Sequence, residues 1–94
     1  MIEFEWDEDK AAQNARKHEV EFEEASTVFG DPLSKTFPNP DHSIEEDRFI
    51  IIGTSDRNRV LIVSHTDRGE KIRIISAREA TRNERKVYED GNFP

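Results

Sequence analysis

The sequence predicts an α+β protein: an antiparallel β-sheet with two helices in its N-terminal part and one helix at its C-terminal end. Apolar residues recur at helical spacing before residue 30 and after residue 80, whereas short apolar runs separated by turns fill residues 49–78. Because turns of a few residues cannot cross over a sheet, neighbouring strands there are expected to be antiparallel. With 94 residues the chain has room for one core, so we expect a single domain over residues 1–94.

The N-terminal elements follow from local signals. Apolar and polar residues alternate over residues 2–6, which is typical of a short half-buried strand. Asp7 is placed to cap a helix over Glu8–His18, which has acids in its first turn and cations in its last. A second, shorter helix is expected from Phe22 to Phe29, stopped by the Gly-Asp-Pro sequence that follows. Residues 33–37 are expected to form an edge strand before a polar loop with two prolines.

Three strands and a helix are expected in the C-terminal half. Turns over residues 55–58 and 67–70 separate the strands. The closing helix is expected to begin after Thr81, which has Glu84 at the spacing of a capping box, and to end at Gly91. The expected strands cover residues 49–52, 59–66 and 71–78.

The last two strands form a hairpin whose faces depend on its turn. A bulged turn of three residues would shift the register and change the faces given by a two-residue turn at Arg68-Gly69. In either register, cations and hydroxyl groups gather at the turn, and Arg78 lies at the other end. With the two-residue turn, one face holds Leu61, Val63, His65, Ile72, Ile74, Ser76 and Arg78. The other face then holds Ile62, Ser64, Thr66, Lys71, Arg73 and Ile75.

Charge is distributed unevenly along the chain. The net charge of −7 taken alone argues against a nucleic-acid partner. Residues 1–56 hold 5 Lys/Arg and 15 Asp/Glu, a balance of −10, whereas residues 57–94 hold 9 and 6, a balance of +3. An acidic first half and a basic second half suit a protein whose working surface faces an anion. A solvated surface with chance segregation of charge is the alternative.

Several classes of protein are disfavoured. No stretch approaches the roughly 18 apolar residues of a membrane span, and no signal peptide is expected, so we expect no membrane partner. Cysteine is absent, which excludes disulfides and fits a cytoplasmic location. His18, His42 and His65 have no second ligand at helical spacing, so neither a metal nor a cofactor is expected.

What remains is a group of arginines with hydroxyl groups, one histidine and one tyrosine. Metal-free RNA cleavage needs little more. A base takes a proton from the 2′-hydroxyl, guanidinium groups neutralise the charge that grows on the phosphate, and an acid protonates the leaving 5′ oxygen. Arginine suits the phosphate because its planar fork binds two oxygens at once.

Two long stretches resemble the BrnT family of RelE-like toxins. The match runs from Phe4 to about Glu89, and its most specific part is the ordered set R-I-I-S-A-R-x-A-T-x-x-E-R-x-x-Y. The opening F-E-W-D-E-D-K-A-A-Q-N-A-R-K-H, followed by V-E-F-E-E-A and F-x-D-P, is similar to the start of these toxins. The second stretch is V-x-H-T-D-R-G-E-K-I-R-I-I-S-A-R-E-A-T-R-N-E-R-K-V-Y-E.

The resemblance implies a RelE-like fold and an endoribonuclease that cuts RNA and slows growth. It also implies a BrnA-like antitoxin that blocks the toxin and carries a DNA-binding end, so that the complex represses its own operon. DNA would then be contacted only through the antitoxin, in an assembly such as a dimer of toxin–antitoxin pairs. We expect Arg68 and Arg78 to bind the phosphate, and His65 or Tyr88 to transfer protons. The residues expected on the RNA backbone are Lys17, Arg73 and Arg82.

Two positions depart from the family pattern: Glu19 stands where a Gly is usual, and Glu21 where a Ser is usual. A Gly would relax the turn, and Glu is a poor helix cap.

Structural interpretations compete with the functional ones. Arg78 can pair with Glu79 or Glu84, His65 and Tyr88 can be core residues, and Glu84 can serve only the capping box. Arg73 can be a solvated strand residue, and Lys17 can merely complement the helix dipole. The alternative function is a non-catalytic family member that binds the antitoxin and regulates transcription within the complex.

Overall fold

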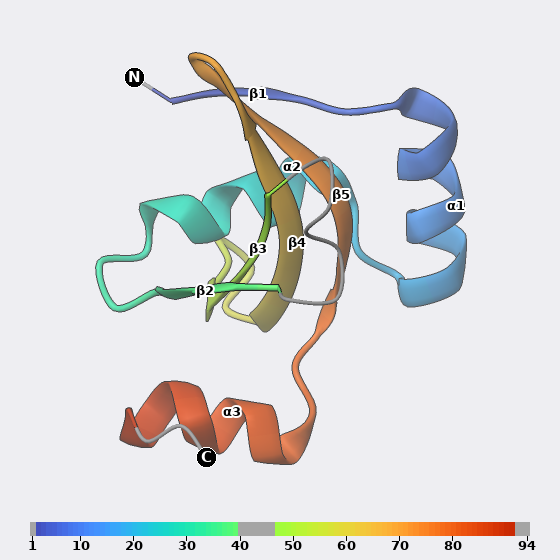
Figure 1. Ribbon diagram of the computed structural model, residues 1–94. Coiled ribbons are helices and arrows are strands. Elements are labelled where there is room, and N and C mark those ends of the chain that lie inside the picture. Colours follow the sequence, from blue (N-terminus) through green and yellow to red (C-terminus); the bar gives the residue numbers. More distant parts are fainter. Residues whose placement is uncertain (1, 40–46, 92–94) are drawn as a thin grey trace.

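The computed structural model describes residues 2–39 and 47–91, with the elements in the predicted order (Figure 1). In these ranges one five-stranded sheet is accompanied by three α-helices, which confirms the α+β class. None of the helices in this described part is long and apolar enough to cross a membrane. The elements are β1 (Glu3–Glu5), α1 (Glu8–His18), α2 (Phe22–Thr27), the 3-10 helix η1 (Val28–Gly30), β2 (Lys35–Pro38), β3 (Arg48–Thr54), β4 (Val60–Arg68), β5 (Lys71–Glu79) and α3 (Arg82–Asp90).

Local signals set the ends of α1 and α3. The Asp7 carboxylate accepts hydrogen bonds from the backbone N–H groups two and three residues later, at 2.8 and 3.1 Å, and so caps α1 as predicted. Thr81 and Glu84 form the predicted capping box at the start of α3. Gly91 ends α3 with a φ of 72°, a left-handed conformation that favours glycine.

The two departures from the family pattern have visible consequences. Glu19 ends α1 in the left-handed region, at φ 59° and ψ 33°, where a side chain with a Cβ is strained. Glu21 occupies the N-cap position of α2, and its side chain makes no capping hydrogen bond. Both residues therefore leave the α1–α2 turn less stable than a glycine and a capping side chain would.

The strand order in the sheet is β1-β5-β4-β3-β2. Strands β2 to β5 form the antiparallel meander that their short turns predict. β1 instead runs parallel to β5, with Phe4 opposite Ile72, so the sheet is mixed rather than wholly antiparallel. Turn length constrains only strands that follow one another, and β1 meets its partner far along the chain.

The β4–β5 hairpin has a different register from the one expected. Its turn is Gly69-Glu70 rather than Arg68-Gly69. Farther along, His65 pairs with the residue before Ile75, whereas Ser64 pairs with the residue after it. Ile75 is thus the extra residue of a β-bulge, and it shifts the register a second time.

The bulge changes the face on which the last strand residues lie. Arg78 pairs with Ile62, and paired residues share a face of the sheet. The expectation that Arg78 lies with Leu61 and Val63 on the core face is therefore wrong, because a single extra residue reverses every side chain beyond it.

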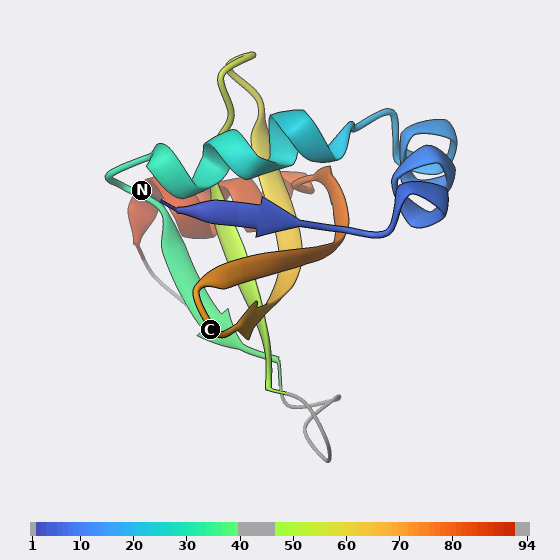
Figure 2. The same cartoon turned by 90° about the horizontal axis from the view of Figure 1, so that it is seen from above.

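The hydrophobic core lies between α2 and one face of the sheet. In Figure 2, α2 runs along the sheet while α1 stands beside it near β5. Phe22 is fully buried and meets the edge of the Trp6 ring at a centroid distance of 5.9 Å. The other buried core residues are Val20, Ala25, Val28, Ile51, Leu61, Val63, Ile74 and Ala77.

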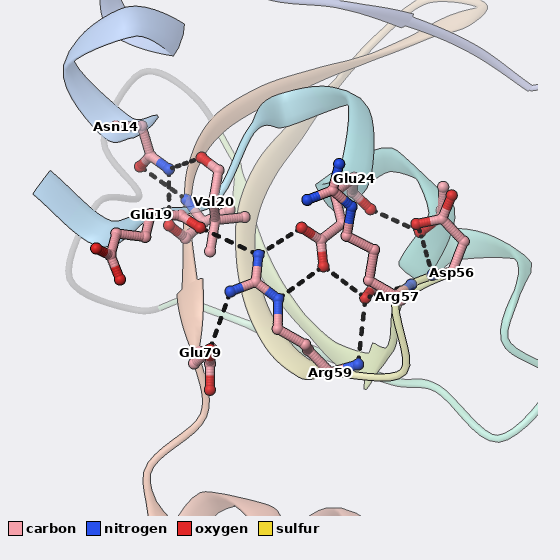
Figure 3. Close-up of polar contacts among 11 residues, drawn as sticks. Asn14, Glu19, Val20, Glu24, Asp56, Arg57, Arg59 and Glu79 are labelled. Atoms are coloured by element: carbon pink, nitrogen blue, oxygen red, sulfur yellow. Dashed lines mark hydrogen bonds and ion pairs between the residues drawn. The ribbon is translucent and has the colours of Figure 1, made fainter. Parts of the chain in front are cut away.

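Arg59 joins several segments around the α1–α2 turn (Figure 3). Its guanidinium holds the buried carboxylate of Glu24 with both Nε, at 2.9 Å from Oε2, and a terminal nitrogen. It also donates to Oε1 of Glu79 at 2.9 Å and to the backbone O of Glu19 at 3.1 Å. The hydrogen bonds that Arg59 and Ser55 donate to the Glu24 carboxylate lower the pKa of that group. This arginine therefore connects the start of β4 to α2 and to β5.

Candidate active site

A groove of about 340 Å³ lies on the sheet face opposite α2, which lies behind the sheet in Figure 1. Its apolar part comes from three isoleucines and one alanine, and its polar part from a histidine, two arginines, an asparagine and two serines. Among the residues that the structure describes, none that lines it is acidic. A concave surface whose described lining holds arginines and no carboxylate suits an anion, in a protein of net charge −7. The lining residues are His18, Asn39, Arg48, Ile50, Ile62, Ser64, Ile75, Ser76, Ala77 and Arg78.

A second concavity of about 310 Å³ lies between α1 and β5. It shares His18, Ile75 and Ser76 with the groove, so the two adjoin. Lys17, which the sequence suggested for RNA binding, lines this second part. The remaining lining residues are Lys10, Gln13 and Asn14.

The guanidinium of Arg78 is held in place but keeps a binding edge. NH1 and NH2 donate to the two carboxylate oxygens of Glu84 at 2.7 and 2.9 Å, and NH1 also donates to the backbone O of Glu79 at 3.3 Å. These bonds use three of the five N–H donors of an arginine. Among the described residues, Nε–H and the second hydrogen of NH2 have no partner, and they form a fork that fits a phosphate.

The Arg78–Glu84 pair stays charged over a wide range of pH. Hydrogen bonding to Arg78 is the main cause that lowers the pKa of the Glu84 carboxyl to about 2. The same bond raises the pKa of Arg78 above its usual range. The interpretations of Glu84 as a member of the capping box and as the partner of Arg78 therefore both hold.

His65 lies in the core rather than in the groove. Its side chain is buried, with 4% of the residue exposed. The ring packs edge-on against Phe29 at 4.8 Å and stacks on Phe49 at 6.0 Å. Burial lowers the pKa of this histidine. Its surroundings correspond to the structural interpretation, since RNA does not reach a ring enclosed in this way.

Tyr88 connects α3 to the rest of the molecule. Its hydroxyl donates to Oδ2 of Asp31 at 2.5 Å and accepts a hydrogen bond from the Thr54 hydroxyl at 3.0 Å. Burial, together with the Asp31 carboxylate, raises the pKa of this tyrosine. Tyr88 does not line the groove, so its contacts are those of an anchor for α3.

The other arginines expected at the site are spread over the molecule. Arg68 is exposed at the hairpin turn, where it pairs with Lys71. Arg78 lies on β5, seven residues beyond the Lys71 that faces Arg68. At strand spacing this is roughly 23 Å, so one phosphate cannot contact both arginines. Arg73 forms an ion pair with Glu5 of β1 at 2.9 Å. Arg82 is exposed in the first turn of α3.

A comparison with protein families decides what kind of chain this is. A family model described as the ribonuclease toxin, BrnT, of a type II toxin–antitoxin system matches residues 6–84. The chain belongs to the BrnT family. Membership implies an RNA target and an antitoxin partner at the level of the family. Among curated protein sequences, no relative matches the chain.

A solved BrnT structure has a similar fold. The crystal structure of the Brucella abortus ribonuclease toxin, BrnT, determined at 1.1 Å resolution, superimposes with a TM-score of 0.68 and 24% sequence identity. The similarity covers 87% of this chain and 100% of that one. At this identity the likeness concerns the fold, here a mixed five-stranded sheet with three helices.

His18 and Arg48 line the groove, yet the sequence marked neither as a site residue. His18 is the last residue of α1, and its neighbours in the groove come from strands far along the chain. The available signal was the Lys-His pair within the BrnT-like opening. His42, the third histidine, lies outside the described residues. Within the described ranges, no three acidic, histidine or cysteine side chains are grouped in a way that could hold a metal ion.

Proposed function

We propose that this BrnT family member is a metal-independent endoribonuclease toxin whose active site is the groove on the open face of the sheet. The composition of the groove carries the proposal: two arginines and a histidine, two serines, several apolar side chains and, among the described residues, no acid. In a chain with 21 Asp and Glu residues, a concavity whose described lining holds none of them suits a polyanion.

His18 and Arg78 have the leading roles in this proposal. His18 takes the proton of the 2′-hydroxyl, whose oxygen attacks phosphorus. The bond from phosphorus to the 5′ oxygen then breaks, solvent protonates that oxygen, and a 2′,3′-cyclic phosphate remains. The free fork of Arg78 binds the phosphate oxygens as their charge increases. Arg48, on the same groove, adds positive charge.

Glu84 acts as a positioning residue for Arg78. Its carboxylate accepts hydrogen bonds from NH1 and NH2 and leaves the fork of Nε–H and the second NH2 hydrogen for RNA. Lys17 contacts the RNA backbone from α1, and Arg82 does so from α3. Arg68, Arg73, His65 and Tyr88 are not assigned to catalysis, because the first two lie away from the groove and the others serve the core and α3.

RNA cleavage in the presence of EDTA tests this assignment. The parent chain is expected to cut RNA, whereas His18→Gln and Arg78→Ala each lose about a hundredfold or more in rate. Arg68→Ala removes the same kind of side chain at the end of β4, beside the hairpin turn, and is the matched control, with an expected rate close to that of the parent. An activity that needs added metal, or an equal loss in Arg68→Ala, would contradict the proposal.

Neutralisation by an antitoxin is the second part of the proposal. Co-expression with its cognate BrnA-like antitoxin is expected to restore growth, and the complex, rather than the toxin alone, is expected to bind operator DNA. A chain that binds the antitoxin but cuts no RNA would instead be the non-catalytic regulator. The stoichiometry of the complex, measured by light scattering, tests the dimer of toxin–antitoxin pairs.

A further inference from the structure

The concavity between α1 and β5 extends the groove beyond the reach of a single phosphate. It continues past His18 along α1, and none of its lining residues in the described part of the chain is acidic. Its α1 side presents two lysines seven residues apart, Lys10 and Lys17, with Gln13 between them. Seven residues correspond to about 10 Å along a helix axis, so the two ammonium groups are placed for different phosphates.

Asn14 fixes which face of α1 lines this concavity (Figure 3). Its buried amide donates to the backbone O of Ala77 at 2.8 Å and of Val20 at 2.9 Å, and accepts a hydrogen bond from the Ala77 N–H at 3.1 Å. These three bonds set the rotation of the helix against β5. Residues three and four positions away share that face, so Lys10 and Lys17 are held beside the strand.

Asp7 is an acidic residue in electrostatic contact with Lys10, and its carboxylate also has hydrogen-bond partners of its own. Its carboxylate accepts the two backbone hydrogen bonds that cap α1. Lys10 is itself exposed. Its ammonium group is therefore on the surface, at the far end of the two adjoining concavities from Arg78.

We propose that Lys10 binds a backbone phosphate of the RNA at a distance from the cleaved bond, so that the substrate runs along α1 from Arg78 past Lys17 to Lys10. This inference rests on the proposed ribonuclease function. If Lys10 contacts the RNA, the length of α1 determines how many nucleotides contribute to binding. A short RNA contacts the groove alone, whereas a longer one also reaches Lys10.

Binding of 2′-O-methyl RNA, which lacks the attacking hydroxyl, tests the inference with the full chain. Single strands of about four and about twelve nucleotides are compared by fluorescence anisotropy at several salt concentrations. Lys10→Ala is expected to bind the longer strand about fivefold more weakly, the effect of one close ion pair in water, and the shorter strand as the parent does. The salt dependence for the longer strand should fall by about 0.7 in log–log slope.

Arg16→Ala is the matched control, because it removes a neighbouring cation of α1 that lines neither concavity. Both variants place alanine, the best helix former, at an exposed position, so they are expected to fold. Equal affinities of the two variants for the longer strand, or an equal loss on both strands, would overturn the inference. Cleavage by the parent would leave the proposed function standing in that case, whereas a parent that neither binds nor cuts RNA would remove both.

Discussion

Glu19→Gly is expected to stabilise the protein by about 1 kcal/mol. Glu19 has a φ of 59°, where a Cβ costs about 1–2 kcal/mol and a glycine has no such strain. The greater freedom of glycine in the unfolded chain takes back roughly half of this gain. Removing an exposed acid from the C-terminal end of α1 adds about 0.3 kcal/mol, because the helix dipole disfavours negative charge there.

Glu19→Ala separates the two contributions. It removes the same charge but keeps the Cβ in the left-handed conformation, so only the small electrostatic gain is expected. The hydrogen bond from Arg59 survives in both variants, because it ends on the backbone oxygen of residue 19. The difference between the variants therefore measures the conformational strain less the greater freedom of glycine in the unfolded chain.

Urea and thermal unfolding of the parent and both variants provide the measurement. A gain of about 1 kcal/mol corresponds to a rise of roughly 4–8 °C in Tm for a domain of this size. The glycine variant should exceed the alanine variant by more than half of that rise. If the two variants unfold at the same temperature, the strain at this position is no larger than the unfolded-state entropy of glycine, and the expected stabilisation is refuted.

Three further predictions concern the same fold. Glu21→Ser should raise the free energy of unfolding by about 1 kcal/mol by capping α2, and Glu21→Ala, which cannot cap, is its control. Arg59→Leu should cost about 3 kcal/mol by leaving the Glu24 carboxylate buried without its partner, and adding Glu24→Leu should recover most of that loss. The folded-state pKa of Glu84 is about 2 against 4.5, so its stabilisation is complete above pH 4.5 and is lost as the pH falls toward 2. In denaturation at several pH values, Glu84→Gln should lose less stability over that range than the parent; an equal loss would refute this origin.

The helix ends were predictable because their determinants lie within a few residues. Asp7 precedes the donors that it caps, and Thr81 lies three residues before Glu84. The meander followed in the same way from short turns between apolar runs. The parallel pairing of β1 with β5 did not, since it joins the two ends of the chain and no local signal specifies it.

The candidate site was less predictable because its parts come from distant segments. The face of Arg78 depends on the bulge at Ile75, and an isoleucine within an apolar run does not mark a bulge. His18 reaches the groove only because Asn14 docks α1 on β5. Strand alternation placed His65 correctly beside the core residues of β4, but the rings that enclose it belong to other elements.

The weak attachment of α3 has a consequence for the timescale on which the site forms. None of its described residues is buried, and its contacts with the body include the pair of Arg78 with Glu84 and the hydroxyl of Tyr88. A helix held in this way can open without exposing the core, at a free energy well below that of global unfolding. Its amides should therefore exchange with deuterated solvent far sooner than those of β4. Arg78 thus lies on the sheet but is oriented by Glu84 of α3, which opens separately. Its orientation is lost and regained with α3 while the sheet remains folded.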